Sequence, residues 1–296
     1  MKKLLLLLTV VVCQIGSAGF ASEPPEILLW PQGMPEPVVP AEPAEIVELG
    51  KDGIQRRTNI SRPRLFVHLP PEGQARSGAG IIVVPGGGFG RLADGHEGAE
   101  ACQWLAKQGV VAFQLAHRTP TTNHKEVNAG PVQDAQQSVC EVRRRAKEYG
   151  VDPQQVGVLG FSAGGQVAVV AATNDLRFPA AAEGPSHKPD FLLLIYPYKI
   201  YDPLTKALRA DIHLDAGLPP TFLAQMGDDG ASVPQGTALL YLELVNRKIP
   251  AEIHVYERGG HGFGMWARPN APGTTDWQRR ASEWLQLRGY VGQKSS

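Results

Sequence analysis

The residue pattern that points most directly to chemistry is G-x-S-x-G, at residues 160–164, in which Ser162 stands between two glycines. The apolar run 156–159 precedes it, and a helix-forming stretch, 166–172, follows it. A sharp turn from a strand into a helix exposes such a serine at its apex, where a side chain in place of either glycine would clash with the strand or the helix. A serine in that position can attack a carbonyl carbon once a base removes its proton. We therefore interpret Ser162 as a candidate nucleophile; the alternative is a glycine-rich turn with an incidental serine.

A histidine is the expected base, because imidazole exchanges protons near neutral pH. Among the eight histidines, His261 follows both the serine and the last predicted strand, in the glycine-rich stretch 259–264. Glycines around a loop histidine leave room for a substrate. His261 is therefore the candidate base, whereas His68 and His254 lie inside predicted strands and are interpreted as structural.

An acid is needed to orient the imidazole and to stabilise its protonated form. Asp228 and Asp229 lie between the serine and the histidine along the chain, directly after the apolar run 221–225, as the order Ser, Asp, His requires. We prefer Asp229, because the loop continues to Val233-Pro234, which has the character of a packing anchor behind the acid. Asp228 stays open as the alternative, and a turn-forming pair of aspartates is the non-functional interpretation.

A glycine-rich loop, residues 86–90, follows another apolar run. Successive glycines allow backbone N–H groups to face a site without side chains in the way. Gly87 and Gly88, together with the N–H of Ala163, are therefore the candidate donors to an oxyanion. A nucleotide phosphate loop is the competing interpretation. It fails because Arg91 stands where the third glycine of a dinucleotide motif would fall, and because no G-K-[ST] follows.

Continuous apolar runs alternate with helical patterns along most of the chain. Predicted strands cover residues 65–69, 81–84, 110–115, 156–159, 191–195, 221–225 and 253–256. Predicted helices cover residues 98–107, 132–149, 164–173, 236–247 and 277–287. Strands without polar alternation are buried on both faces, and strands that alternate with helices form a mostly parallel sheet between two helical layers. The connection 196–220 is long for a compact domain, and we expect it to form a short insertion over the site.

The N-terminus has the pattern of a signal peptide, which we predict for residues 1–21. Lys2 and Lys3 precede the apolar stretch 4–12, and small residues follow up to Ala21. The apolar stretch is shorter than the roughly 20 residues that a membrane span needs. We therefore predict export to the periplasm or the extracellular medium, without stable membrane insertion once the signal is removed.

The next part of the chain, residues 22–60, is rich in proline and glutamate and is predicted to form an extended N-terminal arm. Trp30-Pro31 is the expected anchor of this arm on the body of the protein. The remaining residues, 61–296, are predicted to form one catalytic domain, because their length suits a single large α/β domain.

Charge and composition exclude several classes of function. Lys+Arg and Asp+Glu balance at 29 each, so no basic surface for nucleic acid is indicated. No cluster of His, Cys, Asp or Glu has metal-ligand spacing, and neither a metal nor another cofactor is expected. Beyond the predicted signal peptide lie Cys102 and Cys140, for which two buried free thiols are favoured over a disulfide. The oligomeric state is left open.

Taken together, these segments resemble the α/β-hydrolase fold esterases known as acetylxylan esterases and related exported carbohydrate esterases. The resemblance spans about residues 63–290. It implies the α/β-hydrolase fold, with Ser162 as nucleophile, Asp229 as acid and His261 as base, and with the glycine loop plus Ala163 as the oxyanion hole. The matching segments are P-G-G-G-F-G at 85–90, G-F-S-A-G-G at 160–165, Asp228-Asp229, and G-G-H-G-F-G at 259–264.

Three further features concern this resemblance. Glu97-Gly98 also matches the pattern of these esterases, without a role that the residues reveal. His117-Arg118 occupies a place where Tyr-Arg is commoner, and the loop after Asp229 is one residue longer than the pattern. The two departures bear on the substrate more than on the mechanism.

The resemblance implies an exported serine esterase that hydrolyses short acyl esters, and our hypothesis is acetyl on xylan or related oligosaccharides. A peptidase or a lipase-like hydrolase of the same fold is the alternative, followed by a non-catalytic binding protein that keeps the fold. Aromatic faces suit the apolar faces of sugar rings. The candidates for that contact, each of which could equally be a packing residue, are Phe89, Tyr196, Tyr198 and Trp266.

Overall fold

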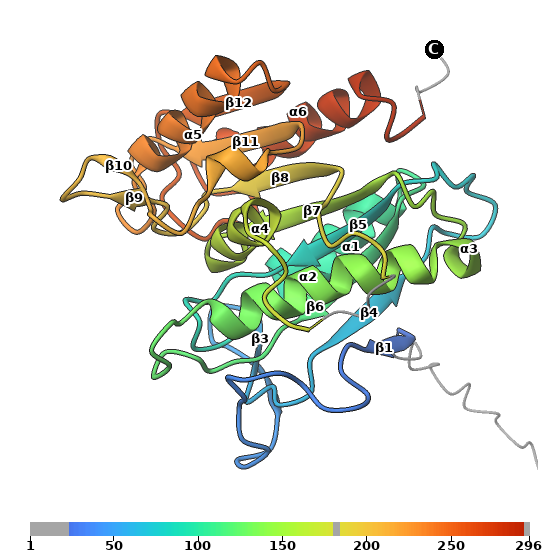
Figure 1. Ribbon diagram of the computed structural model, residues 1–296. Coiled ribbons are helices and arrows are strands. Elements are labelled where there is room, and N and C mark those ends of the chain that lie inside the picture. The colour runs from blue at the N-terminus through green and yellow to red at the C-terminus, as the bar shows by residue number, and fades with distance from the viewer. Residues whose placement is uncertain (1–23, 180–183, 293–296) are drawn as a thin grey trace, which may run out of the picture.

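The centre of the molecule is an eight-stranded sheet (Figure 1). The computed structural model describes residues 24–179 and 184–292, so the predicted signal peptide lies outside the described part of the chain. The strands from β6 onward in spatial order run parallel to one another, whereas β4 runs antiparallel to both of its neighbours. In that order the strands are β1 (Glu26–Leu28), β4 (Arg64–His68), β6 (Val111–Ala116), β5 (Gly80–Val84), β7 (Val156–Phe161), β8 (Phe191–Ile195), β11 (Thr221–Met226) and β12 (Ala251–Tyr256).

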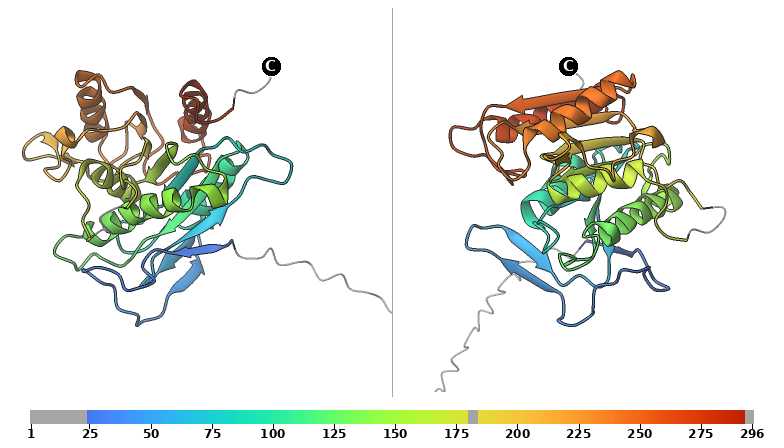
Figure 2. Two further views of the ribbon diagram at one scale, coloured as in Figure 1. Left: turned by 45° about the vertical axis from the view of Figure 1, so that its right-hand side comes forward. Right: turned by 60° about the vertical axis from the view of Figure 1, so that its left-hand side comes forward.

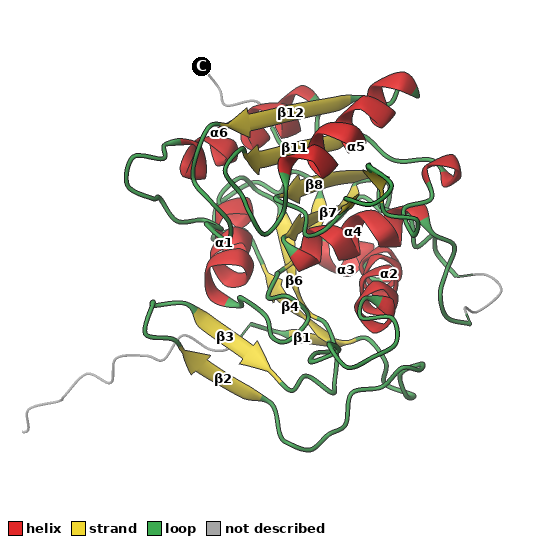
Figure 3. Cartoon of the chain, turned by 90° about the vertical axis from the view of Figure 1, so that its left-hand side faces the viewer, coloured by secondary structure: helices red, strands yellow, loops and turns green. Residues whose placement is uncertain are grey.

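Two layers of helices cover the sheet (Figure 3). One layer contains the π-helical turn η1 (Gly95–Ala99), α1 (Glu100–Ala106) and α6 (Gly273–Leu287), and the other contains α2 (Ala129–Arg144), α3 (Ala146–Tyr149), α4 (Ala163–Thr173) and α5 (Pro234–Asn246). Side chains along one strand alternate between the layers. In β5, Ile81 and Val83 join the cluster that includes α1 and α6, and Ile82 and Val84 join the cluster with α2 and α4. The predicted mostly parallel sheet between two helical layers is thus confirmed.

The predicted strands and helices are all present, with boundaries that shift by a few residues. The predicted helix 132–149 is divided, because α2 ends at Arg144 and α3 begins at Ala146. Gly150 ends α3 in the left-handed conformation, with φ of 65°, which suits a residue without a Cβ atom. Cys102 of α1 and Cys140 of α2 are buried free thiols. No helix within residues 24–179 and 184–292 is long and apolar enough to cross a membrane.

The N-terminal segment is more ordered than an extended arm. β1 pairs with β4 and so extends the main sheet, while β2 (Ile46–Leu49) and β3 (Gln55–Thr58) form a separate antiparallel hairpin (Figure 2). These strands are three or four residues long and largely exposed, which is too short for a sequence pattern to separate them from an extended arm. The bridge between Arg57 and Leu92 joins this hairpin to the loop after the glycine-rich segment.

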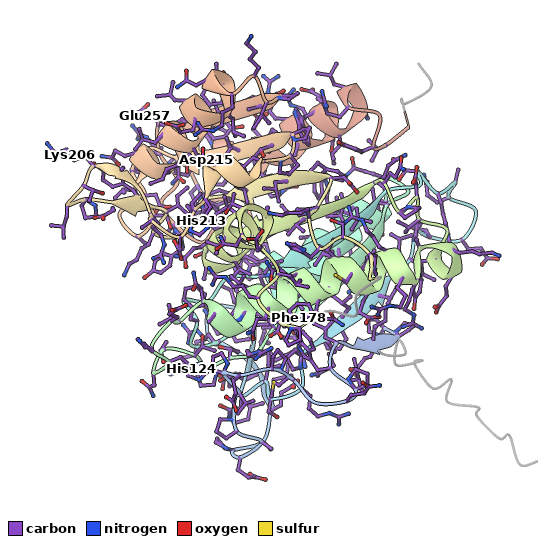
Figure 4. All side chains as sticks on the ribbon, in the orientation of Figure 1. His124, Phe178, Lys206, His213, Asp215 and Glu257 are labelled. Atoms are coloured by element: carbon purple, nitrogen blue, oxygen red, sulfur yellow. The ribbon has the colours of Figure 1, made fainter. Side chains whose placement is uncertain are left out.

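The predicted anchor at Trp30 is confirmed. The indole Nε1 of Trp30 donates to Asp134 Oδ1 of α2 at 2.7 Å, and its ring packs edge-on against Phe178, which Figure 4 labels next to α2. Asp134 also pairs at 2.6 Å with Arg118, and both side chains are fully buried. Arg118 in turn donates to the carbonyl oxygens of Pro35 and Pro37. A buried ion pair therefore binds the first described residues to the catalytic body.

The long connection after β8 forms the predicted insertion. It contains the two-stranded pair β9 (Tyr201–Asp202) and β10 (Ala207–Leu208), followed by the 3-10 turn η2 (Leu214–Ala216). The pair packs against α5 and lies beyond the carboxyl end of the parallel strands, where Figure 4 labels Lys206 and His213. The segment therefore borders the edge of the sheet at which the predicted site residues lie.

Replacement of Trp30 tests the anchor. We expect Trp30→Phe to lower the free energy of unfolding by about 1–3 kcal/mol, because a buried charged acceptor loses its donor. Urea unfolding measures the change. Trp104→Phe is the matched control, since Trp104 packs in the α1–α6 cluster without a recorded indole hydrogen bond to a described residue. Equal destabilisation of the two variants would contradict an anchoring role for the hydrogen bond.

Candidate active site

Ser162 lies at a strained turn between β7 and α4. Its backbone φ is 51° and its ψ is −119°, a conformation that residues with a side chain seldom adopt. The turn fits because the flanking glycines leave no space for a methyl group. A Cβ atom on Gly160 would lie 2.5 Å from the carbonyl oxygen of Gly164, and one on Gly164 would lie 2.0 Å from that of Val84. The backbone N–H of Ser162 donates to Ile195 O at 3.0 Å, which ties the turn to β8.

His261 comes from the glycine-rich loop after β12 and contacts the serine directly. The distance from Ser162 Oγ to His261 Nε2 is 2.7 Å. The serine is 6% exposed and the imidazole is half-buried, so the pair lies at the surface of the core and is open to solvent on one side. Two side chains 99 residues apart in the sequence therefore meet as a nucleophile and a base must.

Asp229 is the carboxylate that contacts the imidazole. Its Oδ2 atom lies 2.8 Å from His261 Nδ1, and the residue is 2% exposed. The other oxygen, Oδ1, accepts hydrogen bonds from the backbone N–H groups of Ala231 and Ser232 at 2.9 and 2.8 Å. Gln225 Nε2 adds a weaker contact to Oδ2 at 3.2 Å. These donors hold the carboxylate in one orientation and compensate for its burial.

Asp228 has a different contact set from its neighbour. It is exposed and does not face the imidazole; its Oδ1 accepts from the backbone N–H groups of Gly259 and Gly260 at 2.9 and 2.8 Å. These hydrogen bonds, that from Gly260 first, lower the pKa of Asp228 below its ordinary value. Arg268 donates to the carbonyl oxygens of Gly259 and His261 from the other side. Asp229 thus contacts the histidine, and Asp228 fixes the loop that carries it.

The glycine loop after β5 approaches the serine closely. A Cβ atom on Gly86 would lie 2.6 Å from Ser162 Cβ. The N–H of Gly86 is occupied, because it donates to Glu97 Oε2 at 2.8 Å. Within residues 24–179 and 184–292, the N–H groups of Gly87, Gly88 and Ala163 have no recorded protein acceptor. Three amide donors near the serine are therefore free to bind an oxygen that develops negative charge.

The four aromatic candidates for sugar contact are not equivalent. Phe89 and Tyr196 are 4% and 0% exposed, so neither presents a face to a ligand, and the expectation for them is wrong. Both rings are taken up by core packing. Tyr198 is half-buried with its ring centre 6.4 Å from that of His261. Trp266 is also half-buried, but its Nε1 donates to Glu100 and its ring packs against His96. Of the two half-buried candidates, Tyr198 is the one whose ring lies beside the imidazole.

A cavity of about 1240 Å³ opens between the insertion and the loop that carries Asp229. Lys125, Lys199 and Asp202 bring charges of both signs to its lining, and Tyr201 adds an aromatic ring. Arg209 and Asp211 line it as an ion pair at 2.8 Å. The lining is mixed and open to solvent, with charged and polar side chains among apolar ones, and Ser162, Asp229 and His261 do not belong to it. In the described ranges, no group of three or more His, Cys, Asp or Glu could hold a metal ion.

Several residues with clear roles in the site geometry were not identified from the sequence. Gln225 lies within β11 and was counted only as a strand residue. Its amide nitrogen contacts Asp229, and its amide oxygen accepts from Thr237 Oγ1 at 3.0 Å. Glu97 contacts the glycine loop, and His96 Nε2 lies 3.1 Å from Gly262 O of the histidine loop. Only Glu97 had a sequence signal, its match to the esterase pattern next to Gly98.

Known proteins with related sequences include enzymes that act on xylan. A family model described as BD-FAE matches residues 65–184, which include the glycine loop and Ser162 but not Asp229 or His261. An acetylxylan esterase from Xylanibacter ruminicola is 32% identical over 209 residues, 64% of this chain and 42% of that protein. An endo-1,4-beta-xylanase B from Butyrivibrio fibrisolvens is 28% identical over 223 residues, 68% of this chain and 34% of that protein. The chain thus spans less than half the length of these two relatives.

Solved structures extend the comparison over the whole fold. An acetyl ester-xyloside bifunctional hydrolase from Caldicellulosiruptor lactoaceticus superposes with a TM-score of 0.68 at 26% identity, covering 93% of this chain and 100% of that one. A thermophilic esterase from Thermogutta terrifontis gives a TM-score of 0.66 at 22% identity, covering 86% and 96% of the two chains, which bears on the fold alone. The chain therefore has the α/β-hydrolase fold and is similar to acetylxylan esterases and other carboxylic ester hydrolases.

Proposed function

We propose that the protein is an exported serine esterase that removes short acyl groups, acetyl in the first place, from xylan or related oligosaccharides. The observation that carries the proposal is the continuous contact from Ser162 Oγ to His261 Nε2 at 2.7 Å and from His261 Nδ1 to Asp229 Oδ2 at 2.8 Å. A hydroxyl, an imidazole and a buried carboxylate in this order form the arrangement that activates serine for acyl transfer.

The reaction proceeds in two halves. His261 Nε2 takes the proton of Ser162 as Oγ attacks the ester carbonyl, and Asp229 stabilises the imidazolium that forms. The N–H groups of Gly87, Gly88 and Ala163 receive the negative oxygen of the tetrahedral intermediate. His261 then returns the proton to the leaving alcohol, which departs and leaves an acyl group on Ser162. In the second half, water loses a proton to His261 and attacks the acyl group. His261 then gives that proton to Ser162 Oγ as the acyl–serine bond breaks and the free acid leaves.

The choice of substrate rests on the relatives and on the wall of the site. One relative is an acetylxylan esterase and another is an acetyl ester-xyloside hydrolase. The cavity next to the Asp229 loop, whose lining carries Tyr201 and several charged side chains, would receive the carbohydrate, and Tyr198 lies beside the imidazole. The signal-peptide pattern of residues 1–21 supports export, which brings the enzyme to an extracellular polysaccharide. No nucleic-acid partner, metal or cofactor is part of the proposal.

Removal of the nucleophile is the first test. We expect Ser162→Ala to lower kcat on a small activated acetate ester by about 10⁴-fold or more, because the acyl-enzyme can no longer form. Ser282→Ala, on α6 with its hydroxyl bonded to Gln278 O, is the matched control and should keep full activity. Undiminished turnover in the Ser162 variant, with the circular dichroism of the folded protein, would rule out the proposed mechanism.

The two neighbouring aspartates should separate in a steady-state comparison. Asp229→Asn leaves the imidazole without its carboxylate and should lower kcat by on the order of 10³- to 10⁴-fold. Asp228→Asn keeps an acceptor oxygen for the loop amides and should lower kcat less than about 10-fold. Both variants need only the acetate ester assay. A larger loss in the Asp228 variant than in the Asp229 variant would contradict the assignment of the acid.

The substrate part of the proposal needs a direct comparison of esters. We expect kcat/KM for acetylated xylo-oligosaccharides to exceed that for an octanoate ester of the same alcohol class by about 10-fold or more, in line with the similarity to an acetylxylan esterase. Released acid, measured by titration, reports both reactions. Preference for the long chain, or hydrolysis of a peptide bond at a comparable rate, would favour a lipase-like enzyme or a peptidase.

A further inference from the structure

Glu97 is a buried carboxylate that takes no part in the proposed reaction. It belongs to the π-helical turn η1 and is 3% exposed. Its two oxygens have different partners: Oε2 accepts from the backbone N–H of Gly86 at 2.8 Å, and Oε1 accepts from the hydroxyl of Tyr196 at 2.9 Å. A carboxylate is costly to bury, so its retention here with two directed contacts calls for a function.

Tyr196 carries the contact onward to the histidine loop. Its hydroxyl donates to Glu97 and also accepts from the backbone N–H of Gly264 at 2.8 Å. Burial, with Glu97 beside it, raises the pKa of Tyr196 well above its ordinary value, so the hydroxyl keeps its proton and can donate. An unbroken series of hydrogen bonds thus runs from Gly86, in the glycine loop, to Gly264, three residues after His261.

The turn that carries Glu97 touches the histidine loop a second time. His96 Nε2 lies 3.1 Å from Gly262 O, and the N–H of Met265 donates to His96 O at 3.1 Å. The approach is tight: a Cβ atom on Gly264 would lie 2.4 Å from His96 Cδ2. These contacts and the Tyr196 link fall on Gly262, Gly264 and Met265 of one loop, which limits how far the loop can shift.

Tyr196 also packs directly against the base. Its ring centre lies 5.0 Å from that of His261 and 4.4 Å from that of Phe263, both in edge-to-face geometry. The residue has φ of 40°, a conformation that costs free energy for a side chain of this size and persists only when contacts fix it. The strained backbone, the ring contacts and the hydroxyl link converge on the loop that carries His261.

These contacts join the two halves of the site that the reaction needs together. Two of the candidate amide donors, Gly87 and Gly88, belong to the loop after β5, whereas the base, His261, belongs to the loop after β12. Catalytic groups must be held within about 0.5 Å of their productive positions to act together. Gly86 lies against Ser162 and beside the candidate donors Gly87 and Gly88, so a shift of Gly86 would move the donors relative to the serine.

We propose that Glu97, acting through Tyr196, is a positioning residue that sets the separation between the oxyanion loop and the histidine loop. The inference rests on the proposed esterase function. Glu97 touches no reacting atom. Its effect is on the geometry in which Ser162 attacks and the developing charge is received, so its loss should affect turnover more than substrate binding.

Two substitutions break the link at different points. In Glu97→Gln the side chain keeps its shape but has a single acceptor oxygen, so it cannot accept from both Gly86 N–H and Tyr196 O–H, and one of these two donors loses its acceptor. Tyr196→Phe removes the hydroxyl and keeps the ring against His261. Tyr256→Phe is the matched control, because the Tyr256 hydroxyl also donates to a carboxylate, Asp276 Oδ2 at 3.1 Å, outside the site.

The experiment compares steady-state kinetics on a small acetate ester with the unfolding midpoint of each variant. We expect Glu97→Gln and Tyr196→Phe each to lower kcat by about 10- to 100-fold with KM within about threefold. The double variant should lose no more than about threefold beyond the worse single variant, because both changes break one link. Tyr256→Phe should lower the unfolding midpoint and keep kcat within about twofold of the wild type.

Three results would overturn the inference. The first is wild-type kcat in both folded single variants. The second is a loss of kcat that equals the fraction of unfolded protein at the assay temperature. The third is a double variant whose loss of kcat is the product of the two single losses. If Glu97→Gln does not fold, Tyr196→Phe alone decides, since it changes one atom. Failure of the proposed function would appear elsewhere, as a Ser162→Ala variant with wild-type rate, whereas failure of this inference leaves that variant inactive and Glu97→Gln fully active.

Discussion

The hydrogen bond between Ser162 and His261 is the contact that the rest of the fold has to produce, because the two side chains follow different strands of the sheet. β7 and β12 run parallel within one sheet, so their carboxyl ends and the loops after them lie at one edge. The hydrophobic clusters on both faces hold those strands in register. Burial along the strands therefore fixes a contact of 2.7 Å between residues that are 99 positions apart.

Close backbone approach is the second constraint, and it explains why the site tolerates so few residue types. The turn at Ser162 presses α4 against β5, with room for only a hydrogen atom at Gly164. As a result Ser162 has an unfavourable positive φ. The hydrogen bond from its N–H to Ile195 O and the helix that follows hold it in this conformation. Gly264 is under the same restriction, because the histidine loop lies so close to His96 that a Cβ atom would not fit. Rigid packing, more than any single hydrogen bond, keeps the reacting groups in place.

The sequence allowed prediction of those features that leave a local pattern. Continuous apolar runs revealed the parallel strands, and glycines on either side revealed Ser162 and His261. Asp229 was preferred with Asp228 left open, because which of two adjacent carboxylates turns toward the imidazole depends on contacts with the amides of residues 231, 232, 259 and 260. Tyr196 was expected to face a sugar and is instead buried. The sequence could not indicate this, because its hydrogen-bond partner Glu97 lies 99 residues away. The exposed strands β2 and β3 have four residues each, and they were missed because so short a segment shows no clear strand pattern.

Covalent labelling tests the central contact most directly. An organophosphonate with a good leaving group reacts with a serine only where a base activates it and amide donors receive the charged oxygen. Incubation of the folded protein should give a single mass increase, and peptide mass spectrometry should place it on Ser162. An unchanged mass in folded protein, or a label on a peptide that lacks Ser162, would contradict the activation of this serine by His261.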